Sequence, residues 1–164
     1  MLGIVLLYVG AVLLINGVGA LGKVDGKSAA VMNLFTGGIS FIINLVNLTH
    51  AKTPVDFYGI GTGLLFAFTY LYVAITNWYE LDGRGLGWYC LFVAITTIPS
   101  SMVSYFGGDI RFTLIWLIWG FLWFLFYLAL GAKKNLGNLL AYSSIAIGIF
   151  TCWIPGYLML IDKW

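Results

Sequence analysis

Three tryptophans within "IWLIWGFLWFLFY", residues 115–127, are the side chains whose type and spacing point most clearly to a function. On a helix that turns by about 100° per residue, Trp116, Trp119 and Trp123 fall within roughly 60° of one another. Such rings could line a narrow slot that excludes hydrated ions, while their N–H groups offer hydrogen bonds to a small planar molecule. The alternative is packing alone. Trp119 lies near the middle of the segment, however, whereas tryptophans that only anchor a membrane helix lie near its ends.

Other faces and segments extend this pattern. Opposite the tryptophans are aliphatic side chains that suit contact with lipid, namely Leu114, Ile118, Leu122 and Leu125. Stripes at helical spacing occur on two further segments and comprise Leu6, Val9, Leu13 and Asn16 on one, and Thr62, Phe66 and Tyr70 on the other. With the neutral polar residues of the apolar segments, these stripes suggest a path for a small neutral polar molecule. Each polar side chain alone could equally form a hydrogen bond between helices.

Residues for catalysis or metal binding are scarce. The single histidine, His50, lies in a polar connection, and no carboxylate or lysine lies deep in an apolar segment. Cys90 and Cys152 are isolated, which is typical of neither a metal site nor a disulfide framework. We therefore predict that the chain is not an enzyme and binds no cofactor or metal. The lack of ionisable residues within the apolar segments also argues against ion pathways, proton relays and charge-coupled transport.

Composition places the stripes on membrane helices. Of the 164 residues, 62% are hydrophobic and 9% are charged, and a helix needs about 20 apolar residues to cross a bilayer core of roughly 30 Å. Charged residues separate six apolar runs, and the net charge of +2 does not indicate a nucleic-acid partner. We predict one all-α domain over residues 1–164, a six-helix transmembrane bundle in contact with lipid, with helices near 2–22, 29–49, 57–79, 87–106, 111–131 and 138–161.

The charges of the connections predict the orientation. Five basic residues lie in the first, third and fifth connections, namely Lys23, Lys27, Arg84, Lys133 and Lys134. The second and fourth connections and the C-terminal tail carry three, namely Lys52, Arg111 and Lys163. Because basic connections favour the cytoplasmic side of the membrane, the excess predicts that both termini lie outside.

Long motifs in consistent order resemble the AmiS/UreI family of urea and amide channels over nearly the whole chain. They are "MLGIVLLYVG" at the start, "KVDGKSAAVMN" at 23–33, "FYGIGTGLLFAFTYLY" at 57–72, "WYCLFVAITTIPSSMVS" at 88–104, "IWLIWGFLW" at 115–123 and "TCWIPGYL" at 151–158. The resemblance implies a homohexameric ring of six-helix protomers, each with its own pore. It also supports termini on the outside.

The same resemblance implies which side chains line the pore. The constriction nearer the cytoplasm would be lined by Trp119, Trp123 and Tyr70, and the outer constriction by Trp116, Phe66, Leu13 and Val9. The family pattern also places Leu122 at the inner constriction. The helical wheel puts Leu122 off the tryptophan stripe, so the predicted lining leaves it out.

Three departures from the family's acid-gated members affect the mechanism. Those members resemble this chain but have long outer connections rich in histidine and carboxylates, whereas the second connection here is short, with His50, Lys52 and Asp56, and the fourth is shorter still. At the position of their gating histidine this chain has Tyr105, which does not titrate near pH 6. Ile147 stands where they have a glutamate. We therefore predict that acid gating is absent.

The resulting prediction is a passive, pH-independent channel for urea or short-chain aliphatic amides in the bacterial cytoplasmic membrane. A cytoplasmic urease or amidase would keep the solute gradient inward. Two alternatives are a proton-coupled amide or ammonium transporter, whose flux would respond to a pH gradient, and a membrane scaffold for such an enzyme. The sequence leaves open whether water passes as well and whether urea or acetamide is preferred.

Overall fold

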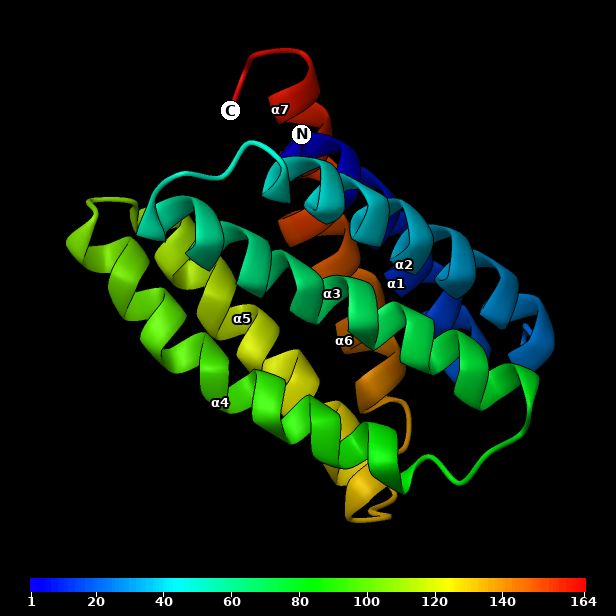
Figure 1. Ribbon diagram of the computed structural model, residues 1–164. Coiled ribbons are helices and arrows are strands. Elements are labelled where there is room, and N and C mark those ends of the chain that lie inside the picture. The colour runs from blue at the N-terminus through cyan, green and yellow to red at the C-terminus, as the bar shows by residue number, and fades with distance from the viewer.

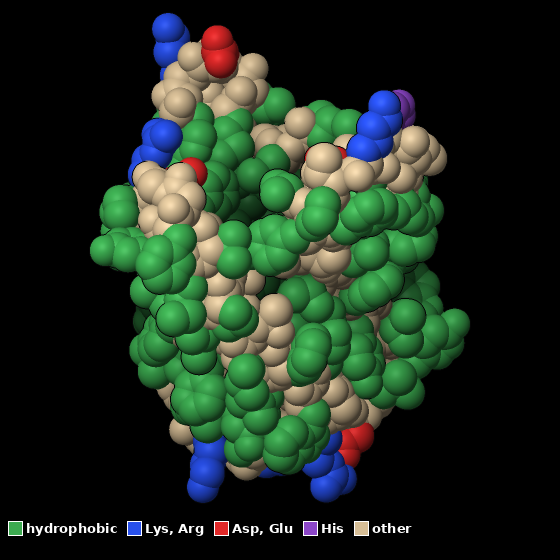
Figure 2. All heavy atoms as spheres, turned by 60° about the vertical axis from the view of Figure 1, so that its left-hand side comes forward, with side chains coloured by type: hydrophobic (Ala, Val, Ile, Leu, Met, Phe, Trp, Pro, Cys, Tyr) green, Lys and Arg blue, Asp and Glu red, His purple; other side chains and the backbone are tan.

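Six long apolar segments form an antiparallel bundle in the computed structural model, which describes residues 1–164 (Figure 1). The segments are α1 (Leu2–Ala20), α2 (Gly26–Leu48), α3 (Pro54–Trp78), α4 (Arg84–Phe106), α5 (Ile110–Phe126) with η1 (Tyr127–Gly131), and α6 (Leu139–Ile147) with η2 (Gly148–Trp153) and α7 (Ile154–Leu160). Each is long and apolar enough to cross a membrane. Figure 2 shows a broad hydrophobic belt with charged side chains gathered at its two ends. The predicted all-α fold with six membrane helices is confirmed.

Charged residues between the helices cap the helices that follow. The Asp25 side chain accepts from the Ser28 amide at 2.9 Å and starts α2 at Gly26, three residues before the expected position. Thr53 and Asp56 form a capping box at α3, and Asp109 accepts from the Phe112 amide at 2.9 Å at the start of α5. Each cap satisfies amide groups that lack partners within the helix.

Packing in the bundle joins helices that are distant in the sequence. The first helix runs beside the last segment, α6 to α7, as well as beside α2, while α3 packs on α2 and α5 on α4. A methyl group placed on Gly10 would lie 2.7 Å from the Trp153 backbone nitrogen, so only glycine permits this approach of α1 to the last segment. The first and last helical segments therefore lie side by side, and both termini are at the same end of the bundle (Figure 1).

Two π-helical turns interrupt the fifth and sixth segments. The fifth segment ends in η1, and η2 separates α6 from α7. A π-helical turn carries an extra residue, so it rotates the side chains that follow relative to a continuous α-helix. In η2 this places Thr151 inside the bundle, where its side chain is buried.

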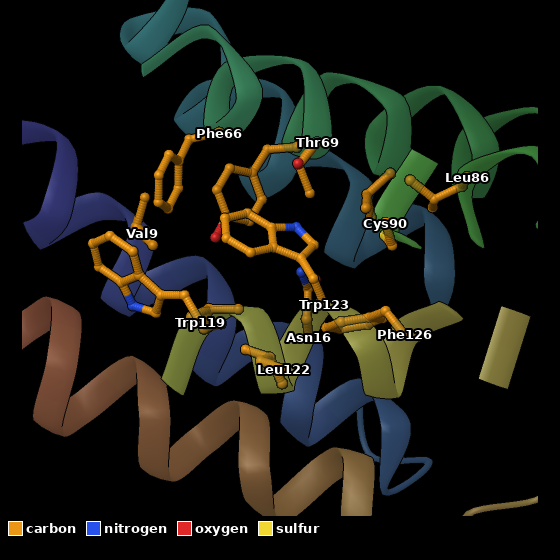
Figure 3. A pocket seen from close by; sticks show the side chains of 13 residues that line it. Val9, Asn16, Phe66, Thr69, Leu86, Cys90, Trp119, Leu122, Trp123 and Phe126 are labelled. Carbon is orange, nitrogen blue, oxygen red and sulfur yellow. The ribbon is translucent and has the colours of Figure 1, made fainter. Parts of the chain in front are cut away.

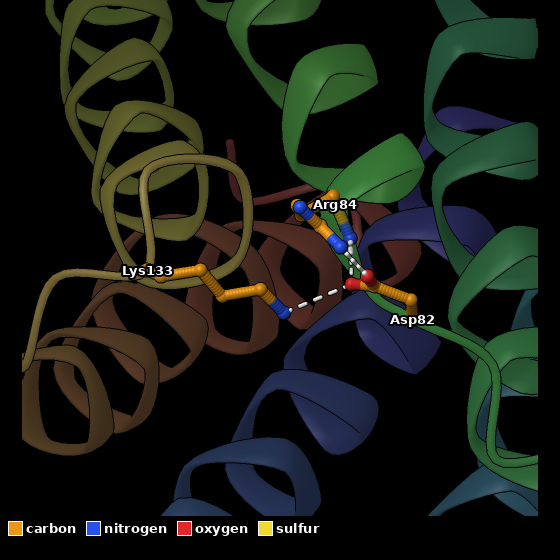
Figure 4. A network of polar contacts seen from close by, with 3 residues as sticks. All are labelled: Asp82, Arg84 and Lys133. Atoms are coloured by element: carbon orange, nitrogen blue, oxygen red, sulfur yellow. Dashed lines mark hydrogen bonds and ion pairs between the residues drawn. The ribbon is translucent and has the colours of Figure 1, made fainter.

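Ion pairs join three connections at the end of the bundle away from the termini. Asp82 contacts Arg84 at 2.6 Å and Lys133 at 3.0 Å (Figure 4), and Lys27 contacts Glu80 at 2.9 Å. The hydrogen bonds from Arg84 and Lys133 hold the pKa of the Asp82 carboxyl well below its usual range. All of these side chains are largely exposed, so each pair is expected to contribute little to stability.

Candidate functional site

A wide cavity, here called the vestibule, opens at the end of the bundle that carries the termini. Its volume is about 680 Å³. Apolar residues of α1, α3 and α5 line it together with seven polar ones, namely Asn44, Asn47, His50, Asp56, Thr62, Ser104 and Asp109. Phe66, Trp116 and Trp119 belong to the same lining. The vestibule could therefore admit hydrated solutes and bring them to an aromatic surface.

A second, narrow space, here called the inner cavity, lies deeper among four helices. Its volume is about 30 Å³, which exceeds the roughly 10–15 Å³ that a cavity needs to hold one water molecule. The lining is mostly apolar and consists of Val9, Leu13, Asn16, Phe66, Thr69, Tyr70, Val73, Leu86, Cys90, Trp119, Leu122, Trp123 and Phe126. Figure 3 shows these side chains converging from α1, α3, α4 and α5. A space this small would admit small solutes one at a time.

Four rings, here called the aromatic partition, stand between the two spaces: Phe66, Trp116, Trp119 and Trp123. Phe66 and Trp119 line both the vestibule and the inner cavity. The Phe66 ring meets Trp119 at 4.8 Å and Trp123 at 5.0 Å between centroids, both edge to face. Trp116 and Trp119 meet in the same way at 5.3 Å. Edge-to-face contacts are favourable for aromatic pairs, so the partition is a packed, rigid unit.

Hydrogen bonding distinguishes the tryptophans of the partition. The Trp119 indole N–H donates to the Thr151 hydroxyl at 2.9 Å, and that hydroxyl donates to the Ile147 carbonyl at 2.6 Å. The expectation that the N–H groups of the stripe would be free for a solute is therefore wrong for Trp119. Its N–H satisfies a protein acceptor because η2 directs Thr151 toward α5.

Two polar groups of the inner cavity have no protein partner. Trp123 and Tyr70 both line this cavity. Their N–H and hydroxyl groups are not buried without a partner, because the one side-chain atom of that kind in the chain is the Ser40 hydroxyl oxygen. Both groups are therefore available to a molecule inside the cavity. Uncharged donors of this kind bind a neutral amide but offer no replacement for the hydration shell of an ion.

The residues of the predicted pore lining lie together around the two spaces. Val9, Leu13, Tyr70 and Trp123 line the inner cavity, Trp116 lines the vestibule, and Phe66 and Trp119 line both. Sequence reasoning missed several further lining residues. Asn16 was on a recognised stripe, whereas Leu86 and Cys90 of α4 carried no periodic signal.

The placement of the aliphatic face of α5 was wrong at two positions. Leu114 and Ile118 are exposed as expected. Leu122 is buried and lines the inner cavity, because positions three residues apart on a helix are neighbours and Leu122 lies beside Trp119. Leu125 is buried as well. In the second half of the fifth segment the neighbouring helices pack closely on α5 and η1. Gly87 of α4, for example, lies against the backbone of Gly131.

The sequence is similar to those of known channels and transporters. A family model described as AmiS/UreI family transporter matches residues 1–163. The chain is 44% identical over 195 aligned positions to the acid-activated urea channel of Helicobacter pylori, with 100% of each chain covered. It is 41% identical over 158 residues to the transporter protein AmiS2 of Rhodococcus erythropolis, covering 94% of this chain and 77% of that protein.

The structural comparison agrees with the sequence comparison. The crystal structure of the urea channel from Helicobacter pylori superposes with a TM-score of 0.92 at 44% identity, covering 100% of this chain and 99% of that one. These relatives are channels and transporters, which confirms the prediction that the chain is not an enzyme. Because the family model matches all but the last residue, this multi-pass membrane protein belongs to the AmiS/UreI family.

Proposed function

We propose that the protein is a passive channel for urea and short-chain aliphatic amides in the bacterial cytoplasmic membrane, with one path through each chain. The observation that carries this proposal is the series of vestibule, aromatic partition and inner cavity within a single bundle. Similarity to a urea channel and to an AmiS transporter favours solutes of this class. A planar amide matches the flat walls and the free Trp123 and Tyr70 donors.

Passive conduction is favoured over proton coupling by the lining of the narrow section. The inner cavity has no carboxylate, histidine, lysine or arginine in its lining. Proton-coupled transport uses such a residue within the membrane to carry the proton. We therefore expect solute to move down its own gradient, with an enzyme that hydrolyses urea or amides as the consumer inside the cell.

Absence of acid gating is a separate part of the proposal. The Helicobacter pylori relative is named as acid-activated, and its alignment runs over 195 positions against the 164 residues here, so that relative carries insertions that this chain lacks. The single histidine, His50, has its Nδ1 atom 3.0 Å from the Val46 carbonyl of its own helix end. His50 is the one imidazole side chain in the lining of the two cavities.

Assembly and orientation follow the family resemblance. We propose a homohexamer with both termini outside, so that the vestibule faces outward and the ion pairs of Asp82 lie in the cytoplasm. Large apolar side chains remain exposed along α2 and α4, including Phe35, Ile42, Phe92 and Ile95. In the membrane, such faces contact lipid or neighbouring chains.

Stopped-flow uptake of urea and acetamide into proteoliposomes tests the proposal, at neutral and mildly acidic pH and beside the Trp123→Ala variant. Fast uptake that is equal at both pH values and altered by the variant is expected. Uptake equal to that of empty liposomes at both pH values would contradict a channel and favour a scaffold for a cytoplasmic enzyme. Uptake that depends on an imposed pH gradient would favour proton coupling instead.

A further inference from the structure

We propose that Asn16 is a solute-binding residue of the inner cavity, where its side-chain amide forms a hydrogen bond with the permeating molecule. This inference rests on the proposed function and extends it to a residue outside the predicted lining. Asn16 lies on α1, one turn beyond Leu13, and is half-buried. It is the one side-chain amide that lines the inner cavity, close to Trp123 in Figure 3.

A fully buried neighbour fixes the orientation of the Asn16 amide. Asn33 of α2 donates one N–H to the Asn16 carbonyl oxygen at 2.7 Å and the other to the Ala29 carbonyl at 2.9 Å. Since both Asn33 N–H groups are used, its side-chain oxygen is left to accept, and it accepts from the Asn16 nitrogen at 3.1 Å. The two amides therefore form a reciprocal pair in which neither can be turned over without losing hydrogen bonds.

This pairing leaves half of the Asn16 amide free. A side-chain amide has two N–H donors and an oxygen with two lone pairs, and Asn33 uses one donor and one lone pair. The remaining N–H and lone pair belong to a residue whose accessible part lies against the inner cavity. These two groups point toward opposite edges of the Asn16 amide, because Asn33 uses the N–H and the lone pair that lie side by side. Each of them can form one hydrogen bond with urea or a primary amide.

Most other polar groups of the inner cavity offer less to a solute, and the Tyr70 hydroxyl, which has no protein partner, would bind the solute together with Asn16. The Thr69 hydroxyl donates to the Leu65 carbonyl at 2.7 Å, and the Trp119 N–H is held by Thr151. Trp123 offers only a donor, and the Cys90 thiol hydrogen-bonds weakly. Asn16 therefore gives the solute a side-chain amide with which to hydrogen-bond inside the inner cavity, beyond the rings that select its shape.

The test compares urea uptake into proteoliposomes by the wild-type protein and by variants Asn16→Leu, Asn33→Leu and Asn47→Leu. Asn16→Leu is expected to lower urea permeability about tenfold, as for the loss of one or two hydrogen bonds to the solute. Asn47 is a matched control, because it is also a half-buried asparagine in a cavity lining, but in the wide vestibule. Its replacement is expected to change uptake less than twofold, about the size of a peripheral contact.

Asn33→Leu separates binding from a purely structural role. It breaks the same pair but keeps the Asn16 amide in the cavity, so it is expected to lower the melting temperature at least as much as Asn16→Leu while retaining most of the urea uptake. Equal losses of uptake in both variants would overturn the proposal and leave the pair as a link between α1 and α2. Wild-type uptake with no loss in a folded Asn16→Leu protein would also overturn it. No wild-type uptake would instead contradict the proposed function.

Discussion

The vestibule encloses about 680 Å³ and the inner cavity about 30 Å³, although α1, α3, α4 and α5 contribute to both. Polar residues of the vestibule lie near helix ends, where Asp56 and Asp109 already cap α3 and α5. The inner cavity is lined mostly by apolar residues, and its rings contact one another. The difference indicates that solutes are admitted in the first space and selected in the second, so substitutions in the narrow part should have the larger effects.

Removal of the partition is expected to have the largest effect. Trp119→Ala would join the vestibule to the inner cavity, because Trp119 lines both. The ratio of urea to butyramide permeability is expected to fall at least about tenfold, since tight apolar sites discriminate by that factor for a single methylene. Stopped-flow uptake of the two solutes measures the ratio. A folded variant with an unchanged ratio would show that selection occurs elsewhere.

Loss of the hydrogen bond that holds Trp119 is expected to have an intermediate effect. Thr151→Val keeps the shape of the side chain but leaves the buried indole N–H without its acceptor, which costs about 1–3 kcal/mol of stability. Urea permeability and the ratio of urea to acetamide should change by a few fold, about fivefold if about 1 kcal/mol of this cost appears in the barrier to permeation. Thr151→Ser restores the hydroxyl and should restore both. Failure of serine to rescue would mean that the methyl group matters more than the hydrogen bond.

Replacement of a vestibule residue is expected to have a small effect. Asn47→Ala removes a polar group from a wide space in which water can take its place. Urea uptake should change less than about twofold, the range of most substitutions away from a packed site. A large loss would show that the vestibule also binds and selects the solute, which would weaken the division between the two regions.

The smallest effect on transport is expected at the ion pairs of Asp82. The hydrogen bonds from Arg84 and Lys133 lower the pKa of Asp82 from its ordinary value of 3.8. A lowered carboxyl pKa stabilises the fold above that ordinary value, and the stabilisation is lost as the pH falls through the lowered pKa. Between pH 5 and pH 7.5, both urea uptake and the contribution of Asp82 to stability should therefore be constant.

Asp82→Asn is the control for this pH prediction. It is expected to lower the melting temperature slightly at neutral pH and to leave uptake unchanged, because Asp82 lies at the bundle end and outside both cavities. Thermal unfolding in detergent and uptake in proteoliposomes measure the two quantities. A rise in uptake on mild acidification of the wild-type protein would contradict the absence of acid gating.

Sequence patterns carried most of the information about the helices. Apolar length predicts the six membrane segments, and the period of 3.6 residues brings Trp116, Trp119 and Trp123 to one side of α5. These features depend on local chain geometry, which a single sequence expresses directly.

Features that depend on contacts between helices could not be predicted from one chain read alone. The wheel assumes a straight helix with one fixed outer face, so it misplaced Leu122 and Leu125 on α5. The hydrogen bond from Trp119 to Thr151 depends on η2, and the hydropathy pattern gives no signal of a π-helical turn. The pairing of Asn16 with Asn33 likewise needs the crossing of α1 and α2.

Enclosure of the inner cavity by four helices of a single chain has a genetic consequence. If chains with a blocked cavity are expressed together with intact ones, each intact copy keeps its own complete route. Transport by a mixture of blocked and intact chains should then decline in direct proportion to the blocked fraction. Blocked chains should not inhibit the intact chains beside them. An allele that encodes a blocked chain would therefore behave as recessive. One functional copy of the gene beside it would supply half of the transport capacity.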